Sequence, residues 1–275
     1  MTVLGQLSDG LRAAGFISLA MAFVALLETA IPLHARGHWN GAHLVPNLAL
    51  MLLTFATNVF FNAALVLTLA WLPAKGLGLL NVLTLGPVAG GAVTVVVLEF
   101  AWYVTHRSMH KIPAFWRFHR VHHSDPVVDV TTTIRQHPGE GVIRYVYLGA
   151  FATALGASPG AFAVYRVWSA LNGLLEHANL RVPARIDSLL SLVVVTPNMH
   201  KIHHSRRAQE TDTNYGNIFS VFDRLLATFT PSVRGLNIPY GLDGFDDASA
   251  QTTAGLLAAP FRDDAQRTAT VAAAG

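Results

Sequence analysis

The chain has 275 residues, of which 52% are hydrophobic and 13% are charged, and its mean hydropathy is +0.41. A typical soluble domain carries roughly 25% charged residues, so this composition argues against a soluble enzyme and indicates a polytopic membrane protein. The absence of cysteine excludes disulfides, thiolate metal sites and a cysteine nucleophile, and the net charge of +3 fits basic cytoplasmic loops rather than nucleic-acid binding.

Three apolar segments in the first 105 residues are long enough to cross a membrane. Residues 11–33 exceed the length of a signal-peptide apolar core, so we expect a retained first helix. Residues 45–71 and 86–105 match the roughly 20 residues that span a ~30 Å hydrocarbon core. A Gly/Pro/Leu-rich connection, 72–85, separates them, and the third segment runs directly into His106.

The second half of the chain alternates polar inserts with apolar segments. The insert 106–144 is strongly basic, which predicts a cytoplasmic location. Residues 145–179 are apolar and broken at 156–160, which predicts a hairpin that leaves and returns on the same side. Residues 186–196 are too short to span and predict an interfacial or re-entrant helix, and 197–244 form a second polar insert.

We therefore expect an all-α fold, in which a polytopic membrane domain carries a cytosol-facing, histidine-rich helical cap. Its regions are the N-terminal membrane helices (1–105), the histidine-rich region with its hairpin (106–244) and a loose C-terminal tail (245–275) that is rich in Ala, Thr, Asp and Gln. Three crossings before a cytoplasmic insert put the N-terminus outside. If 72–93 only dips into the bilayer, or the second segment is a hairpin, the N-terminus lies inside.

Histidines recur in three boxes with helical spacing. Positions i, i+3 and i+4 share one face of a helix, so each box directs two or three imidazoles to one point. The boxes are HxxxH, HxxHH and HxxHH, made of His106 and His110; His119, His122 and His123; and His200, His203 and His204.

Eight imidazoles without thiolates suit two metal ions that keep open coordination positions. Imidazole binds iron, zinc, copper and nickel, whereas a structural zinc site needs four ligands and usually includes cysteine. At a membrane boundary, the chemistry that fits is oxygen activation against an apolar substrate. A metal transporter would place its ligands at mid-membrane, and a zinc hydrolase would need a general-base carboxylate as in HExxH, which the sequence lacks.

The order of the boxes resembles the fatty acid hydroxylase/sterol desaturase superfamily of membrane di-iron enzymes. The resemblance covers about residues 95–230 and includes Glu99 and Tyr103 ahead of the first box. It extends to four further motifs, FHRVHHS at 118–124, RQHPGE at 135–140, TPNMHKIHHS at 196–205 and NYGNIFSVFDRLLATF at 214–229.

This resemblance implies an O₂-dependent oxidoreductase that hydroxylates or desaturates a C–H bond of a sterol, fatty acyl or related lipid. It implies two Fe²⁺ ions, which zinc can replace in purified protein, and an external ferredoxin- or cytochrome-type electron donor with its reductase. The implied ligands are the eight box histidines together with His137 and His177. The implied location is a bacterial inner membrane, with the active site on the cytoplasmic side.

Alternatives remain within and outside this superfamily. A relative cleaves glyceryl ether lipids with a pterin reductant, and a non-catalytic or hydrolytic metal-binding membrane protein is the other class. No haem-binding or flavin-binding segment is evident and no GxGxxG follows a strand, so electrons are expected from a separate protein.

Further polar residues near the boxes have two interpretations each. Asn214 and Asp223 either orient ligand histidines or cap turns, and Glu99, seven residues before His106, either bonds a ligand or pairs with an arginine. Four arginines of the inserts either dock an acidic electron donor or anionic lipid headgroups, or only reflect cytoplasmic topology: Arg107, Arg120, Arg206 and Arg207.

Overall fold

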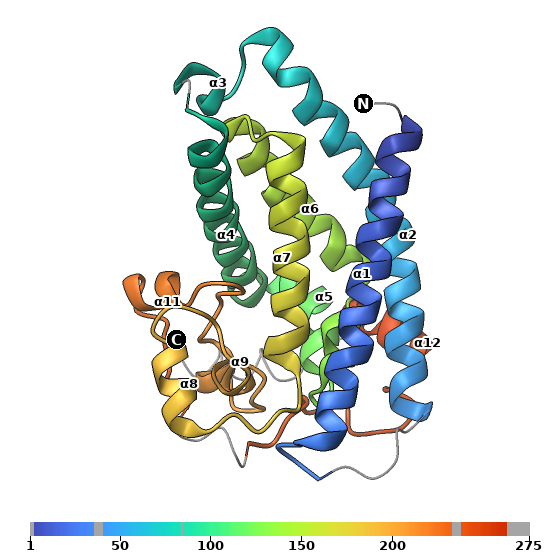
Figure 1. The fold of residues 1–275 in the computed structure, drawn as a ribbon. Coiled ribbons are helices and arrows are strands. Elements are labelled where there is room, and N and C mark those ends of the chain that lie inside the picture. Colours follow the sequence, from blue (N-terminus) through green and yellow to red (C-terminus); the bar gives the residue numbers. More distant parts are fainter. Residues whose placement is uncertain (1–2, 36–40, 84, 233–237, 263–275) are drawn as a thin grey trace, which may run out of the picture.

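The computed structural model describes residues 3–35, 41–83, 85–232 and 238–262, and these residues form helices and loops without a β-strand. The fold is all-α, as the composition and apolar periodicity predict. The long helices run roughly along one axis in Figure 1, and the shorter helices gather mainly at one end of them.

Among the residues that the structure describes, three helices are long and apolar enough to cross a membrane. They lie in α1 (Val3–Ala30), in α2 (Gly41–Trp71) continued through η1 (Leu72–Lys75) and α3 (Leu79–Leu83), and in α4 (Pro87–Lys111). The helix α4 continues past residue 105 and carries the first histidine box on its last turns. It ends because Pro113 disfavours a helical residue before it, and Ile112 is extended with φ −95° and ψ 114°.

The chain runs in alternating directions along α1, α2 and α4. Figure 1 shows the N-terminus and α3 at one end of the bundle, and α5 (Pro113–His123) and α9 (Pro197–His203) at the other. The histidine boxes therefore lie at the end opposite to the N-terminus, because three long helices precede them.

Two more long helices, α6 (Pro138–Leu155) and α7 (Pro159–His177), complete the bundle. Gly156 ends α6 with a left-handed φ of 72°, and the Ser158 side chain caps α7 by accepting the N–H of Ala161. Both helices pack against α4, and their buried side chains form the largest apolar core together with residues of α2 and α4.

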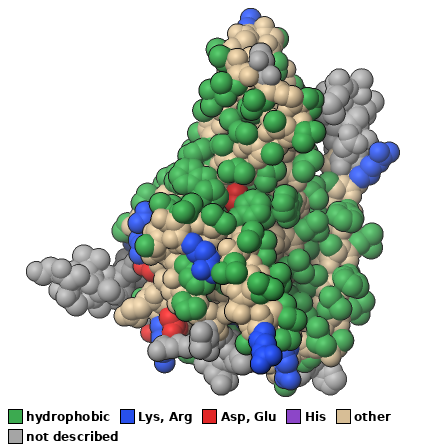
Figure 2. Space-filling model, turned by 60° about the vertical axis from the view of Figure 1, so that its left-hand side comes forward, with side chains coloured by type: hydrophobic (Ala, Val, Ile, Leu, Met, Phe, Trp, Pro, Cys, Tyr) green, Lys and Arg blue, Asp and Glu red, His purple; other side chains and the backbone are tan. Residues whose placement is uncertain are grey.

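The outer surface of the bundle is strongly apolar. Figure 2 shows hydrophobic side chains over the upper and middle parts of one face, while most of the basic and acidic side chains on this face gather lower down. Exposed side chains of the candidate spans include Leu19, Phe60 and Val88. Such a surface is stable in lipid and would aggregate in water, so the chain is a membrane protein.

The tail from residue 245 is not loose throughout, contrary to the expectation from its composition. It forms α12 (Thr253–Ala258) and η4 (Ala259–Phe261), and Leu256 and Ala259 are fully buried against Leu50 and Val121. The six residues of α12 are too few to show a helical periodicity, so the sequence does not predict that this segment packs against α2 and α5. The remainder of the expected tail, 263–275, lies outside the described residues.

Arginine side chains fasten this C-terminal segment to α5. Arg120 is buried and donates hydrogen bonds to the carbonyls of Ala259 and Arg262, and Arg117 donates to the carbonyl of Pro260 at 3.2 Å. Because α5 carries the second histidine box, the segment stabilises the helix that positions three imidazoles.

The substitution Leu256→Ala should destabilise the protein by about 2–5 kcal/mol, because it leaves a cavity against α2 and α5. Thermal unfolding in detergent measures this as a lowered midpoint. Leu19→Ala is the matched control, because Leu19 is 72% exposed on α1 and should have little effect. Equal midpoints for the two variants would show that α12 does not support the fold.

Candidate metal centre

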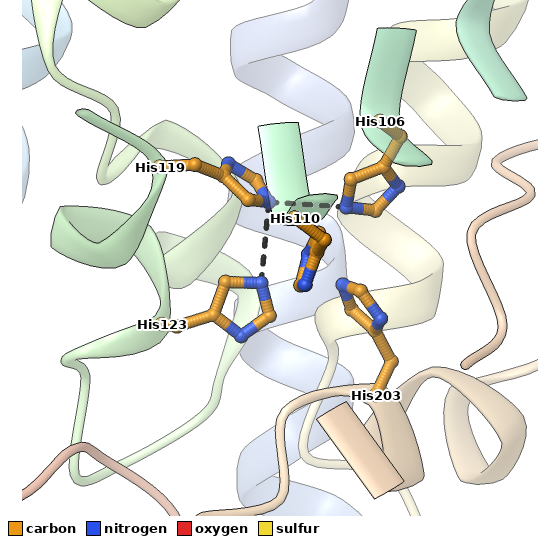
Figure 3. A group of neighbouring side chains, drawn as sticks. All are labelled: His106, His110, His119, His123 and His203. Carbon is orange, nitrogen blue, oxygen red and sulfur yellow. Dashed lines mark hydrogen bonds between the residues drawn. The ribbon is translucent and has the colours of Figure 1, made fainter. Parts of the chain in front are cut away.

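Nine buried histidines form two separate clusters at the end of the bundle. Within each cluster, one ring nitrogen from every residue lies within 4.8 Å of all the others. The five-histidine cluster consists of His106 and His110 from α4, His119 and His123 from α5, and His203 from α9. Figure 3 shows these five imidazoles pointing toward one another from three elements.

The four-histidine cluster lies beside the first one and draws on α5, α7 and α9. It contains His122, His177, His200 and His204. The ring centroids of His123 and His204, one from each cluster, are 4.6 Å apart. All nine members are buried, and all belong to the ten ligand positions that the sequence predicts.

Adjacent histidines of a box belong to different clusters. His122 and His123 diverge, as do His203 and His204, because consecutive residues of a helix point about 100° apart at 3.6 residues per turn. The HxxHH pattern thus supplies ligands to two points from one short helix. The two adjacent histidines of HxxHH therefore serve different clusters.

Backbone carbonyls fix the tautomer of three imidazoles. The Nδ1–H groups of His106, His177 and His203 donate to the carbonyls of Tyr215, Gly173 and Thr213 at 2.8, 2.7 and 2.7 Å. The proton therefore sits on Nδ1, and Nε2 keeps a lone pair for a metal.

Carboxylates lie beside the outer nitrogens of further histidines. Oε1 of Glu140 is 3.3 Å from Nδ1 of His119, and Oδ1 of Asp212 is 3.2 Å from Nδ1 of His110. Each carboxylate favours a proton on Nδ1 and raises the basicity of the inner nitrogen. The sequence reasoning missed both residues, although the RQHPGE motif contains Glu140.

The spacing of the inner nitrogens fits a shared cation. Nε2 of His119 lies 3.1 Å from Nε2 of His106 and 3.2 Å from Nε2 of His123, and Nε2 of His177 lies 3.0 Å from those of His122 and His200. Two nitrogens each about 2.1 Å from one ion are about 3.0–3.4 Å apart at common coordination angles. Between His106 and His119 the partners on Nδ1 leave a lone pair on each Nε2, and two facing lone pairs are favourable only around a cation.

The imidazoles are held in the neutral form that binds metals. Burial, followed by repulsion from neighbouring histidines, lowers the pKa of His122, His123, His200 and His204 well below the usual value. Burial lowers the pKa of His203 to about 3. Among the described residues, Nε2 of His203 and both nitrogens of His204 lack a hydrogen-bond partner. Buried polar atoms are normally hydrogen-bonded, so these nitrogens are available as metal ligands.

His137, which the resemblance implies as a further ligand, lies outside both clusters. It is the N-cap of α6, where its Nδ1 accepts the N–H of Gly139 at 3.0 Å, and its ring lies 5.2 Å from that of Phe118. The residue before a proline at the first helical position favours an extended backbone, which turns this side chain to the helix end.

Glu99, Asn214 and Asp223 act on the backbone and not on the imidazoles. Oε1 of Glu99 accepts the N–H groups of residues 217–219, and Asp223 accepts those of Tyr215 and Gly216. Burial raises the pKa of Asp223 to about 6, although these donors oppose the shift.

Asn214 closes the same loop. It adopts a left-handed φ of 57°, and its side chain bonds Met199 of α9 and the backbone of Thr230. The loop held in this way presents the carbonyls that orient His106 and His203, so the three predicted residues position the ligands indirectly.

Arg120, Arg206 and Arg207 are engaged within the chain. Arg120 is buried under the C-terminal segment, and Arg206 pairs with Asp243 at 2.8 Å and with Asp246. Arg107 and Arg207 are exposed, and Nη1 of Arg207 lies 3.9 Å from Oε1 of Glu210. Arg120 is therefore a structural residue and not part of a docking surface.

The fold and the clusters define a helical membrane protein with a buried polyhistidine centre that could hold metal ions. The model of the fatty acid hydroxylase family matches residues 91–228, about half of the chain, so this protein belongs to that family. The matched region contains both clusters in full.

Several curated proteins are similar to the same region. An alkylglycerol monooxygenase of Caenorhabditis elegans is 32% identical over 135 residues, which cover 48% of this chain and 25% of that protein. The ornithine lipid hydroxylase OlsE of Rhizobium tropici is 34% identical over 151 residues, which cover 54% of this chain and 44% of that protein.

A very-long-chain aldehyde decarbonylase of Oryza sativa subsp. indica is 26% identical over 167 residues, which cover 58% of this chain and 24% of that protein. The chain thus spans less than half the length of each of these three relatives. No solved structure matches it.

The substitution Glu140→Gln removes the charge beside His119 and preserves the side-chain size. We expect the metal affinity to fall about 10- to 100-fold, because the ligand loses its orienting partner, and chelator competition measures the change. Asp246→Asn is the control, because it removes an exposed carboxylate that pairs only with the surface Arg206. Unchanged affinity in Glu140→Gln would show that Glu140 does not orient the imidazole.

Proposed function

We propose that the protein is an O₂-dependent oxidoreductase that uses two iron ions to hydroxylate a C–H bond of a lipid. The observation that carries this proposal is the pair of buried, thiolate-free histidine clusters at one end of a membrane bundle. Membership of the fatty acid hydroxylase family supports the reaction class. Two similar proteins are named as an ornithine lipid hydroxylase and an alkylglycerol monooxygenase, which favours hydroxylation over desaturation.

The donor set suits iron. Neutral imidazoles with nearby carboxylates bind Fe²⁺ well, and O₂ reduction requires a metal that changes its oxidation state, which zinc does not. The five-histidine cluster would hold one iron and the four-histidine cluster the other. Bound iron would supply the activation of O₂ for attack on an unactivated C–H bond.

The protein's own part is orientation and exclusion of water. The carbonyls of Tyr215, Thr213 and Gly173 keep three Nε2 atoms directed inward. Burial lowers the pKa of four other imidazoles and keeps them neutral: His122, His123, His200 and His204. Trp116 covers the five-histidine cluster, with its ring 5.1 Å from that of His110 and 5.5 Å from that of His123. Dry surroundings protect a reactive centre from side reactions.

Electrons would come from a separate ferredoxin- or cytochrome-type protein with its reductase. The histidine end would face the cytoplasm of a bacterial inner membrane, because the insert 106–144 is basic. Three candidate spans before this insert would then put the N-terminus on the other side.

A second candidate reaction is oxidative cleavage of a glyceryl ether lipid. The similarity to alkylglycerol monooxygenase, at 32% identity, favours it specifically. It would use the same metal clusters with a pterin as reductant, so substrate and reductant distinguish it from the first proposal.

Iron-loaded protein in lipid vesicles, supplied with ferredoxin, ferredoxin reductase, NADPH and isotope-labelled O₂, tests the reaction. We expect a lipid product that has gained one labelled oxygen atom, detected by mass spectrometry, and no such product from His203→Ala. Labelled aldehyde released from an ether lipid with a pterin would select the second candidate. A lipid that loses two hydrogens without label would indicate desaturation, and no lipid change with any reductant would contradict the proposal.

A further inference from the structure

The second polar insert exposes a continuous set of apolar side chains. They lie on α8 (Ala184–Leu190), on the turn that follows it and on α11 (Val221–Leu225) and its last cap. We name this set the α8–α11 surface. Its members are 37% to 73% exposed: Ile186, Leu189, Leu190, Leu192, Val193, Val221, Leu225 and Leu226. Monomeric proteins in water rarely expose so many large apolar residues together.

Hydrogen bonds join α8 and α11 into one rigid unit. The N–H of Ser220 donates to the carbonyl of Val193 at 3.0 Å, and its hydroxyl donates to the carbonyl of Ser191 at 2.7 Å. Arg224 donates to the same Ser191 carbonyl at 2.7 Å. The α8–α11 surface is therefore a fixed part of the fold and not a frayed loop.

This unit is continuous with the surface of the membrane bundle. The ring of Phe222 on α11 lies 5.3 Å from that of Phe100 on the candidate span α4, and Phe219 lies 5.6 Å from Trp168 on α7. Figure 1 shows α11 beside the lower end of α4, with α8 further from the bundle.

The position of Phe100 gives the depth of α11. At 1.5 Å per residue, Phe100 lies about 20 Å from Pro87 along α4, and a hydrocarbon core is about 30 Å thick. If the core begins near Pro87, it extends about 10 Å beyond Phe100 and includes Phe222 and the apolar side of α11, while the exposed Arg224 of α11 extends toward the headgroups. The helix α8 then lies at the boundary of the core and the headgroups.

The charged residues on α8 and just before it fit a position at the boundary of the hydrocarbon core and the headgroups. Arg181 and Arg185 are exposed beside the apolar residues, where guanidinium groups pair with lipid phosphates. The acidic residue of α8, Asp187, is fully buried and accepts the hydroxyls of Thr196 and Ser232. It therefore presents no negative charge to the headgroups.

We propose that the α8–α11 surface is embedded in the bilayer leaflet on the side of the histidine clusters, with α11 in the hydrocarbon and α8 at the headgroups. The embedded unit is coupled to the metal centre, because Thr196, held by Asp187, caps α9, which carries His200 and His203. The bilayer thus supports the third histidine box from one side. This inference depends on the surface and not on the reaction, so it is tested without turnover.

The cysteine-free chain allows a direct measurement of depth. Single cysteines replace Leu225 and Leu189, which are 73% and 67% exposed, and each carries a nitroxide label in vesicles of phosphatidylcholine and phosphatidylglycerol. The ratio of oxygen to nickel-chelate accessibility, measured by power-saturation EPR, rises with depth. We expect a ratio for Leu225→Cys severalfold above that of a water-exposed label, and an intermediate ratio for Leu189→Cys.

Two further single-cysteine variants give the reference accessibility ratios for hydrocarbon and for water. Phe60→Cys, 71% exposed on α2, reports the hydrocarbon, and Gln209→Cys, exposed on the polar insert, reports water. Metal content equal to that of the parent protein shows that each variant is folded. A ratio for either Leu225→Cys or Leu189→Cys that equals that of Gln209→Cys would overturn the proposal.

Discussion

Convergence of nine buried imidazoles on two points is the constraint on which the rest of the structure depends. Nε2 atoms approach to 3.0–3.2 Å in both clusters, and backbone carbonyls hold the proton of His106, His177 and His203 on Nδ1. Burying so many polar rings together is costly, and burial also disfavours their protonation. The fold therefore holds nine side chains in a geometry that metal binding would stabilise.

The supporting structure is arranged in layers around this geometry. Tertiary packing of α2, α4, α6 and α7 fixes the helix ends from which the boxes project. The loop 213–220 then supplies two orienting carbonyls, and it is anchored by Glu99 within a candidate span and by Asp223. The C-terminal segment holds α5 from the other side through Arg120. Each layer fixes the position of the imidazoles, although the residues named here are not members of the clusters.

The sequence predicted the parts of this centre that follow from local periodicity. Helical spacing predicted that histidines four residues apart share a cluster, as His106 with His110, His119 with His123 and His200 with His204 do, but His122 and His203 lie in the opposite cluster from the rest of their boxes. Apolar length predicted the three candidate spans. What it missed depends on tertiary contact. The sequence does not reveal that His137 caps α6, or that Glu99 accepts a hydrogen bond from the backbone 118 residues away. Leu256 is buried because it packs against α2 and α5, and the six residues of α12 contain no pattern that predicts this contact.

Iron per chain, measured by elemental analysis and Mössbauer spectroscopy on anaerobically prepared protein, tests the central claim that each cluster holds one metal. The clusters share no ligand, so His203→Ala and His200→Ala remove a ligand from different sites, while His137→Ala removes a histidine from neither. We predict two iron ions per chain for the parent protein and for His137→Ala, and one for each of the other variants. One metal ion in the parent protein, or two in His203→Ala and His200→Ala, would contradict the account.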